Sequence, residues 1–297
     1  MPMESSAHKQ LKDGSCMTRL GAEDLLSLAP TVKAIFCDLD GTFLDTRHLL
    51  PPGALDAIRA VQASGVRFIP TTGRTVFALR QLFGEAFKGL DLDYVACNGM
   101  DVACAGTVLR HANCPYDAAC ALLQHISCDP RPLGFVVYGQ ADPYVLDMEA
   151  DYVRAKIESL HTAEIRKATQ GLEEKQISKL AVVAHRGAPL LARQLTKEFG
   201  RSFEFSACGE EWVDVAARGY TKLGGIEMLL DVRGLGPDEV IAIGDSMNDR
   251  TMLEALPLSV CVSNAMPAVK RLCRYEIASN AELAVPQLLE AIAAARV

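Results

Sequence analysis

Strands and helices alternate in two separated parts of the chain, residues 31–100 and 207–297. An apolar run from Val32 to Phe36 predicts a buried strand, and Val66 to Ile69 predicts a second. Between them, three apolar residues recur at helical spacing: Leu55, Ile58 and Val61. Strand, helix and strand in close succession are typical of a βαβ unit and hence of a parallel sheet.

The same alternation returns after residue 207. Trp212 to Val215 predicts a strand that resumes the first pattern, and Lys222 begins a helix. Val240 to Ile243 and Ser259 to Val262 predict two further buried strands, and Pro286 to Ala295 predicts a closing helix. The fold class is therefore α/β: a Rossmann-like, doubly wound parallel sheet core made from residues 31–100 and 207–297.

Residues 101–206 have a different pattern, in which strands and helices follow in mixed order. Helices are expected at 116–126, 151–160 and 189–199, and strands at 133–138, 144–148, 180–184 and 203–205. This order predicts an α+β cap domain inserted into the core. Residues 1–30 form an N-terminal extension, expected to be flexible in its first half, with one short helix at 21–28.

Composition narrows the function classes. The 297 residues are enough for about two domains. A net charge of −7 argues against a nucleic-acid or anionic-membrane partner, and no apolar run reaches membrane-spanning length. The ten cysteines are scattered without a C-x-x-C pair, so we expect reduced thiols in a soluble, cytoplasmic protein.

Two carboxylates follow the first strand. Asp38 and Asp40 are two residues apart, so on an extended chain both side chains point the same way. Like charges this close need a cation or a shared proton, and Mg²⁺ is the natural oxygen-binding partner. Gly41 allows a sharp turn, and Thr42 offers a hydroxyl and an N–H to an anion. A solvated Asp-rich turn is the alternative, which the buried strand disfavours.

Further polar groups follow other strands. Thr72 ends the second strand, beside Gly73 and Arg74, which suits a phosphate-binding turn. Lys222 at a helix start opposes the helix dipole, although alone it would be interpreted as a surface lysine.

Another carboxylate follows the strand expected at Val240 to Ile243. Asp245 stands at its end, with Asn248 and Asp249 within about one helical turn. Since parallel strand ends meet at one edge, these groups should converge on a site for a metal and a phosphate.

The motifs together resemble the haloacid dehalogenase-like hydrolase superfamily. They are DLDGT at 38–42, TTGR at 71–74, Lys222 and GDSMND at 244–249. GDSMNDRTML at 244–253, with VSNA at 262–265 and SNAE at 279–282, is similar to the Cof-type phosphatase branch with a large α/β cap. The likeness covers 32–100 and 207–297 with readable motifs, and the cap by position and size.

The resemblance implies a role for each group. Asp38 would attack phosphorus to form an aspartyl-phosphate, and Asp40 would protonate the leaving oxygen and then activate water. Mg²⁺ would bind Asp38, the Asp40 backbone carbonyl and Asp245, supported by Asn248 and Asp249. Thr72 and Lys222 would hold the phosphoryl group. The substrate-binding candidates are Gly41, Thr42, Gly73, Arg74, Asn98 and Asn248.

The expected function is Mg²⁺-dependent hydrolysis of a small phosphorylated metabolite, with a sugar phosphate as first guess. A phosphotransferase or mutase with the same intermediate is the alternative enzyme, and a non-catalytic phosphometabolite-binding protein is the alternative from another class. Specificity should come from the cap, where Tyr138, His185 and Glu210 are candidates for facing the cleft. Oligomeric state cannot be read from the sequence.

Overall fold

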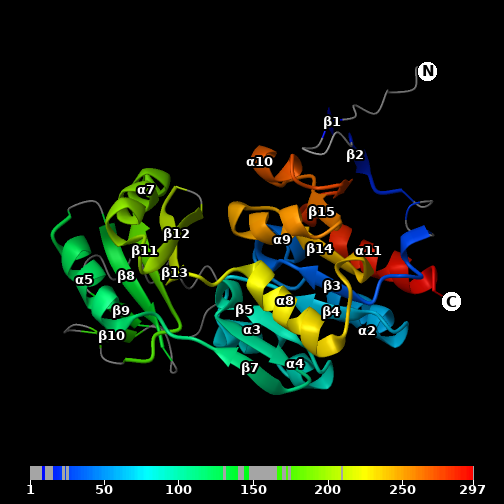
Figure 1. Cartoon of the computed structure of the whole chain (residues 1–297), viewed down its shortest axis with the longest axis horizontal. Helices are drawn as coiled ribbons and strands as arrows, with labels where there is room; N and C mark the ends of the chain where they lie inside the picture. The colour runs from blue at the N-terminus through cyan, green and yellow to red at the C-terminus, as the bar shows by residue number, and fades with distance from the viewer. Residues whose placement is uncertain are drawn as a thin grey trace.

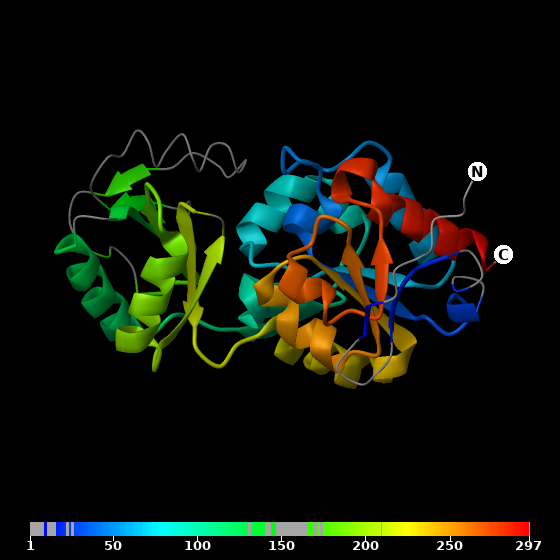
Figure 2. The same ribbon diagram turned by 90° about the horizontal axis from the view of Figure 1, so that it is seen from above.

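The computed structural model has two parts, a larger core and a smaller cap (Figures 1 and 2). The structure describes residues 9–10, 16–21, 24, 27–129, 132–139, 144–146, 166–168, 172, 175–208 and 210–296. The helix expected at 151–160 lies outside these residues. The first described strand, β1 (Lys9–Gln10), and the last helix, α11 (Ala284–Ala294), lie on the side of the core away from the cap (Figure 1).

The core is organised around a mainly parallel sheet. Its seven described strands follow the order β1-β2-β16-β15-β14-β3-β4. Their bounds are Lys9–Gln10 (β1), Cys16–Arg19 (β2), Ala34–Cys37 (β3), Arg67–Pro70 (β4), Val240–Gly244 (β14), Leu258–Val262 (β15) and Tyr275–Ile277 (β16). Neighbouring strands are parallel except β1 and β2. The predicted doubly wound α/β core is confirmed.

Helices cover both faces of this sheet, which explains why strands such as β3 and β14 are apolar and buried along their whole length. The helices of the core are α2 (Ala54–Ala63), α3 (Val76–Phe83), α4 (Ala86–Gly89), α8 (Lys222–Arg233), α9 (Arg250–Ala255), α10 (Pro267–Lys270) and α11 (Ala284–Ala294). Figure 2 shows α11 above the sheet and α8, in yellow, below it.

A small antiparallel sheet extends the core beyond β4. It consists of β5 (Tyr94–Ala96), β6 (Asp101–Cys104) and β7 (Thr107–His111), and a parallel bridge from Thr71 to Val95 joins it to the end of β4. Val102, Ala103 and Cys104 pack in the main hydrophobic core. Residues 101–111, which the sequence pattern assigned to the cap, therefore pack with the core.

In the described part of the cap, six strands form one sheet, and two helices pack against it. Its strand order is β10-β9-β8-β11-β13-β12. The elements are α5 (Tyr116–Ser127), β8 (Pro132–Tyr138), β9 (Tyr144–Leu146), β10 (Arg166–Ala168), β11 (Lys179–Ala184), α7 (Ala188–Phe199), β12 (Phe203–Cys208) and β13 (Trp212–Ala217). α5 and α7 pack with these strands in a second hydrophobic core.

One strand differs from the sequence-based assignment. β13 was expected to resume the core, but it pairs antiparallel with both β11 and β12 in the cap sheet. Its sequence, WVDVAA, is apolar enough to be buried in either domain, and only the pairing partners decide between them. The cap thus begins after His111 and ends near Ala217.

The N-terminal extension contributes to the core sheet. β2 lies parallel to β16. The Thr18 N–H of β2 donates to the carbonyl of Arg274, the residue just before β16, at 3.1 Å. Of the helix expected at 21–28, the described residues Asp24, Ser27 and Leu28 are helical. Across the described part of the chain, no helix has the length and apolar character needed to cross a membrane.

Candidate active site

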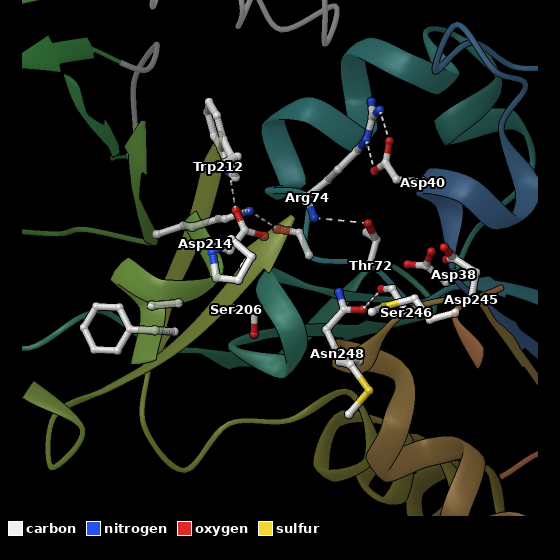
Figure 3. Close-up of a pocket in the computed structure, with 18 of the residues that line it drawn as sticks. Asp38, Asp40, Thr72, Arg74, Ser206, Trp212, Asp214, Asp245, Ser246 and Asn248 are labelled. Atoms are coloured by element: carbon white, nitrogen blue, oxygen red, sulfur yellow. Dashed lines mark hydrogen bonds and ion pairs between the residues drawn. The ribbon is translucent and has the colours of Figure 1, made fainter. Parts of the chain in front are cut away.

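Three neighbouring strands of the core deliver polar side chains to one edge of the sheet. Asp38 follows β3, Thr72 lies just beyond β4, and Asp245 follows β14, with β3 paired to both of the others. The edge faces the cap across a cavity (Figure 3). The structure thus brings together groups that lie far apart in sequence.

A buried lysine links two of the carboxylates. Lys222 Nζ donates to Asp38 Oδ1 at 2.5 Å and to Asp249 Oδ1 at 2.6 Å, and all three side chains are almost completely excluded from solvent. Burial lowers the pKa of Lys222, but the charges of Asp249 and Asp38 outweigh it and raise the pKa above its ordinary value. The lysine is therefore a fixed positive charge against Asp38.

Asp249 orients this lysine rather than facing the cavity. Its Oδ2 accepts hydrogen bonds from the backbone N–H groups of Asp245 and Ser246, both at 3.0 Å, while its Oδ1 accepts from Lys222. Gly244 makes this possible, since a Cβ there would lie 2.5 Å from Asp249 Cγ. Both Asp249 oxygens are thus already engaged.

Asp245 lies beside Asp38 in an acidic cluster. Ligand oxygens of Asp38, Asp245 and Asp249 lie within 4.8 Å of one another. Burial and the charge of Asp249 raise the pKa of Asp245 to about 6, although its hydrogen bonds with Thr42 and Asp38 act to lower it. Burial likewise raises the pKa of Asp38, although Lys222 opposes the effect. Three carboxylates with one lysine leave uncompensated negative charge.

Thr42 and Gly41 shape the pocket around Asp245. The Thr42 hydroxyl donates to Asp245 Oδ1 at 2.9 Å, so it positions the carboxylate instead of facing a bound anion as expected. Gly41 has a φ of +81°, and a Cβ there would lie 2.6 Å from Asp245 Oδ2. Asn264 donates its amide to the Gly41 carbonyl at 2.7 Å and fixes the turn.

A methyl group at Gly41 should therefore disable the site. Gly41→Ala is expected to lower kcat by about 10²-fold, because a small misplacement of a catalytic carboxylate costs about that much. Gly53→Ala is the matched control, since Gly53 also has positive φ (+77°) but no atom within 4 Å of an added Cβ. Both variants should lose about 1–2 kcal/mol of unfolding free energy through backbone strain, measured by denaturant unfolding. Equal kinetics in the two variants would contradict the assignment.

Asp40 is turned away from the acidic cluster. Arg74 binds it with two hydrogen bonds, Nε to Oδ2 at 2.7 Å and Nη2 to Oδ1 at 2.6 Å, and His48 Nδ1 lies 2.9 Å from Oδ1 (Figure 3). Burial would raise the pKa of Asp40, but the hydrogen bonds and charges of Arg74 and His48 prevail and hold it well below its ordinary value. Asp40 is thus ionised in this arrangement.

The turn after β4 carries the remaining core groups. Thr72 Oγ1 accepts from the Arg74 N–H at 3.1 Å, and Gly73 lines the cavity beside it. Asn98 has a φ of +55°, and its Oδ1 accepts from Asn248 Nδ2 at 3.3 Å. Asn248 lines the cavity, whereas Asn98 stands behind it as a support.

The cap closes one side of a cavity of about 930 Å³ above these groups. Tyr138 and Glu210 line it, whereas His185 is not among the lining residues. Lys179 from the cap donates to the Gly73 carbonyl at 2.9 Å, and it pairs with Asp214 at 2.8 Å. A direct hydrogen bond thus joins the cap to the turn after β4.

Sequence reasoning missed several of these residues. Lys179 and Asp214 stand inside otherwise apolar strands, KLAVVA and WVDVAA, and a charge in such a strand is the signal that could have singled them out. His48 lies in a loop and had no such signal, whereas Asn264 belongs to the VSNA motif at 262–265 but had been given no role.

Comparisons with known proteins agree with this geometry. The family model described as haloacid dehalogenase-like hydrolase matches residues 35–289. The pyridoxal phosphate phosphatase YbhA of Escherichia coli is 26% identical over 274 residues, covering 87% of this chain and 98% of that protein. The HMP-PP phosphatase of Citrobacter koseri is 24% identical over 238 residues, covering 77% of this chain and 84% of that protein.

A solved structure has the same fold along most of the chain. A HAD/COF-like hydrolase from Plasmodium vivax superposes with a TM-score of 0.81 at 24% identity, covering 92% of this chain and 99% of that one. The core, the cap and their order along the chain therefore have a structural precedent.

Proposed function

This chain belongs to the haloacid dehalogenase-like hydrolases and is a phosphatase, and on that premise we propose that it hydrolyses a small phosphorylated metabolite with Mg²⁺ through an aspartyl-phosphate on Asp38. The observation that carries the proposal is the setting of Asp38. It is a buried carboxylate at the cavity edge, with a lysine on one oxygen and the carboxylate of Asp245 beside it.

The donor set fits a hard divalent cation. Asp38 and Asp245 supply carboxylate oxygens in a cluster whose negative charge exceeds that of its lysine, and oxygen donors are what Mg²⁺ prefers. Asp249 is committed to Lys222 and to two backbone N–H groups, so we assign it to supporting the site. When bound, Mg²⁺ would supply positive charge to stabilise charge on the transferring phosphoryl group.

The chain's own residues account for the two displacements. An oxygen of Asp38 forms a bond to phosphorus as the bond from phosphorus to the leaving oxygen breaks. Water then attacks phosphorus, releases inorganic phosphate and restores the Asp38 carboxylate. Lys222 and Thr72 stabilise the phosphoryl oxygens in both steps, from positions fixed by Asp249 and by the turn after β4.

Asp40 moves the proton in both steps. It gives a proton to the leaving oxygen in the first step and takes one from water in the second. Its pairing with Arg74 and His48 keeps it ionised, so the ion pair must loosen and the carboxylate must take a proton from solvent before the first step. An incoming phosphate attracts Arg74 by the same bidentate geometry and can promote that release.

The substrate occupies the cavity beneath the cap, which excludes water from the reacting groups. A sugar phosphate is the first guess from the sequence, and the relative YbhA acts on pyridoxal phosphate. A test panel should therefore contain glucose 6-phosphate, pyridoxal 5′-phosphate and 4-nitrophenyl phosphate.

Removal of the metal should abolish turnover. Dialysis against EDTA is expected to lower phosphate release by roughly 10²-fold or more, since metal stabilisation of the transition state is worth several kcal/mol. Adding Mg²⁺ back should restore the rate, measured on 4-nitrophenyl phosphate. Undiminished release after chelation would contradict the assignment of a metal site to Asp38 and Asp245.

The same assay separates the alternatives. A phosphotransferase would form the aspartyl-phosphate but release phosphate slowly unless an acceptor alcohol is added. A non-catalytic binding protein would bind the panel without forming phosphate. Fast, metal-dependent release without an acceptor supports hydrolysis alone.

A further inference from the structure

One face of the cap sheet looks into the catalytic cavity, and its side chains can be assigned from the strand register. Lys179 stands opposite Tyr138, and Ala181, two residues on, stands opposite Asp214, so these side chains share a face. Trp212, two residues before Asp214, is on the same face. Intervening residues such as Leu180, Val182, Val213 and Val215 pack instead in the hydrophobic core of the cap.

Asp214 lies on this face, on β13, and lines the cavity. Its Oδ1 accepts from Trp212 Nε1 at 2.7 Å and from Lys179 Nζ at 2.8 Å. Among the residues that the structure describes, none donates a hydrogen bond to Oδ2. That oxygen would lie 3.5 Å from a Cβ at Gly73, so it is directly against the phosphate-binding turn. Figure 3 shows Asp214 between Trp212 and Thr72.

Aromatic and apolar side chains line part of the cavity that this oxygen faces, among polar ones such as Ser206 and Asn248. Tyr138 and Trp212 line the cavity on the cap side, and Ala78, Met247 and Met266 line it on the core side. Met247 and Met266 are 43% and 47% exposed, which is unusual for large apolar side chains. Thioether sulfur makes favourable contacts with aromatic rings. The wall therefore suits a flat ring, with one position for a hydrogen-bond donor.

We propose that the organic part of the substrate is a planar nitrogen heterocycle, whose ring N–H or amino group donates to Asp214 Oδ2. This inference rests on the proposed phosphatase function and narrows its substrate. On this face the polar groups of Trp212, Lys179 and Asp214 are bonded to one another. A sugar would bring several hydroxyl groups there with few partners, and unsatisfied hydroxyls would weaken binding. A heterocycle leaves few polar groups to satisfy and fits between aromatic side chains.

Three phosphate esters separate the two features of the proposed ligand. Pyridoxal 5′-phosphate has a flat ring and a ring N–H, 4-nitrophenyl phosphate has a flat ring without a donor, and glucose 6-phosphate has donors without a flat ring. Wild-type enzyme with Mg²⁺ should show a higher kcat/KM for pyridoxal 5′-phosphate than for glucose 6-phosphate.

Asp214→Asn is the decisive variant, because the amide can keep the bonds to Trp212 and Lys179 while replacing the free acceptor with a donor. It is expected to lower kcat/KM for pyridoxal 5′-phosphate about tenfold or more, chiefly through KM, as expected for loss of a charged hydrogen bond. The values for 4-nitrophenyl phosphate should change by less than about twofold. Asp117→Asn is the matched control, since it makes the same substitution in the cap at an exposed residue of α5 that does not line the cavity.

A second variant keeps the test decisive if Asp214→Asn folds poorly. Tyr138→Leu removes the ring that lies 5.8 Å from Lys179 Nζ but keeps both side chains of the Lys179–Asp214 pair. It should raise KM for both ring substrates but not for glucose 6-phosphate. A preference for glucose 6-phosphate, or equal effects of Asp214→Asn on all three esters, would overturn the inference while phosphatase function stands. Absence of phosphate release from 4-nitrophenyl phosphate by the wild type would instead contradict the proposed function.

Discussion

Replacing Asp38 with asparagine is expected to lower kcat by about 10³-fold or more, because an amide cannot form the aspartyl-phosphate and loss of a nucleophile removes the whole covalent route. The fold should survive, since asparagine has nearly the same shape and Lys222 keeps Asp249 as its partner at 2.6 Å. Phosphate release under saturating substrate measures the effect, and circular dichroism checks the fold.

Asp56→Asn provides a control with the same chemical change. Asp56 lies on α2 with 82% of its side chain exposed, far from any role in the cavity, and its replacement should leave kcat unchanged. Mass spectrometry of the acid-quenched wild type should detect a phosphorylated peptide containing Asp38. Wild-type turnover in Asp38→Asn would show that another group attacks phosphorus.

Lys222→Met should damage both stability and activity. The substitution leaves Asp38 and Asp249 buried without their cation, and breaking a buried ion pair from one side typically costs about 3–5 kcal/mol. Denaturant unfolding measures the loss of unfolding free energy. Lys270→Met is the comparison, because its pair with Glu276 is partly exposed, at 23% and 27%, and such a pair contributes about 1 kcal/mol or less.

The destabilisation of Lys222→Met should also depend on pH. Burial raises the pKa of Asp38 above its ordinary value and Lys222 opposes that rise, so without the lysine the pKa of Asp38 in the folded variant rises further. The folded state of the variant then binds protons more readily than the unfolded state. The stability of the variant then increases as pH falls. The difference in unfolding free energy between wild type and variant should therefore narrow from pH 8 to about pH 5. A difference in unfolding free energy that is small, or that does not change with pH, would mean that Lys222 does not stabilise the buried carboxylates.

Much of the core was predictable because its signals are local. The runs Ala34–Cys37 and Val240–Gly244 are apolar and end in Asp38 and Asp245, and parallel strands must bring such ends to one edge. Lys222 was suspicious at a helix start, and the structure gives the reason: it is completely buried between two carboxylates.

The cap was less predictable because its limits depend on pairing partners. β13 continues an apolar pattern that fits either domain. Because the sequence assigned it to the core, Asp214 was not recognised as a cap residue that lines the cavity. The bonds of Asp40 to Arg74 and His48 were also unpredictable, since sequence spacing places Asp40 beside Asp38 but does not fix which way its side chain turns.

The pairing of β3 with β14 affects the order in which the chain can fold. Thr42 and Asp245 are hydrogen-bonded although they are 203 positions apart, and β3 has β14 as one of its two neighbours. Closing so long a loop is slow, whereas the cap sheet joins only strands between Pro132 and Ala217. On the ribosome, the cap strands are therefore complete before β14 exists, and the carboxylates of Asp38 and Asp245 meet only after β14 has been synthesised.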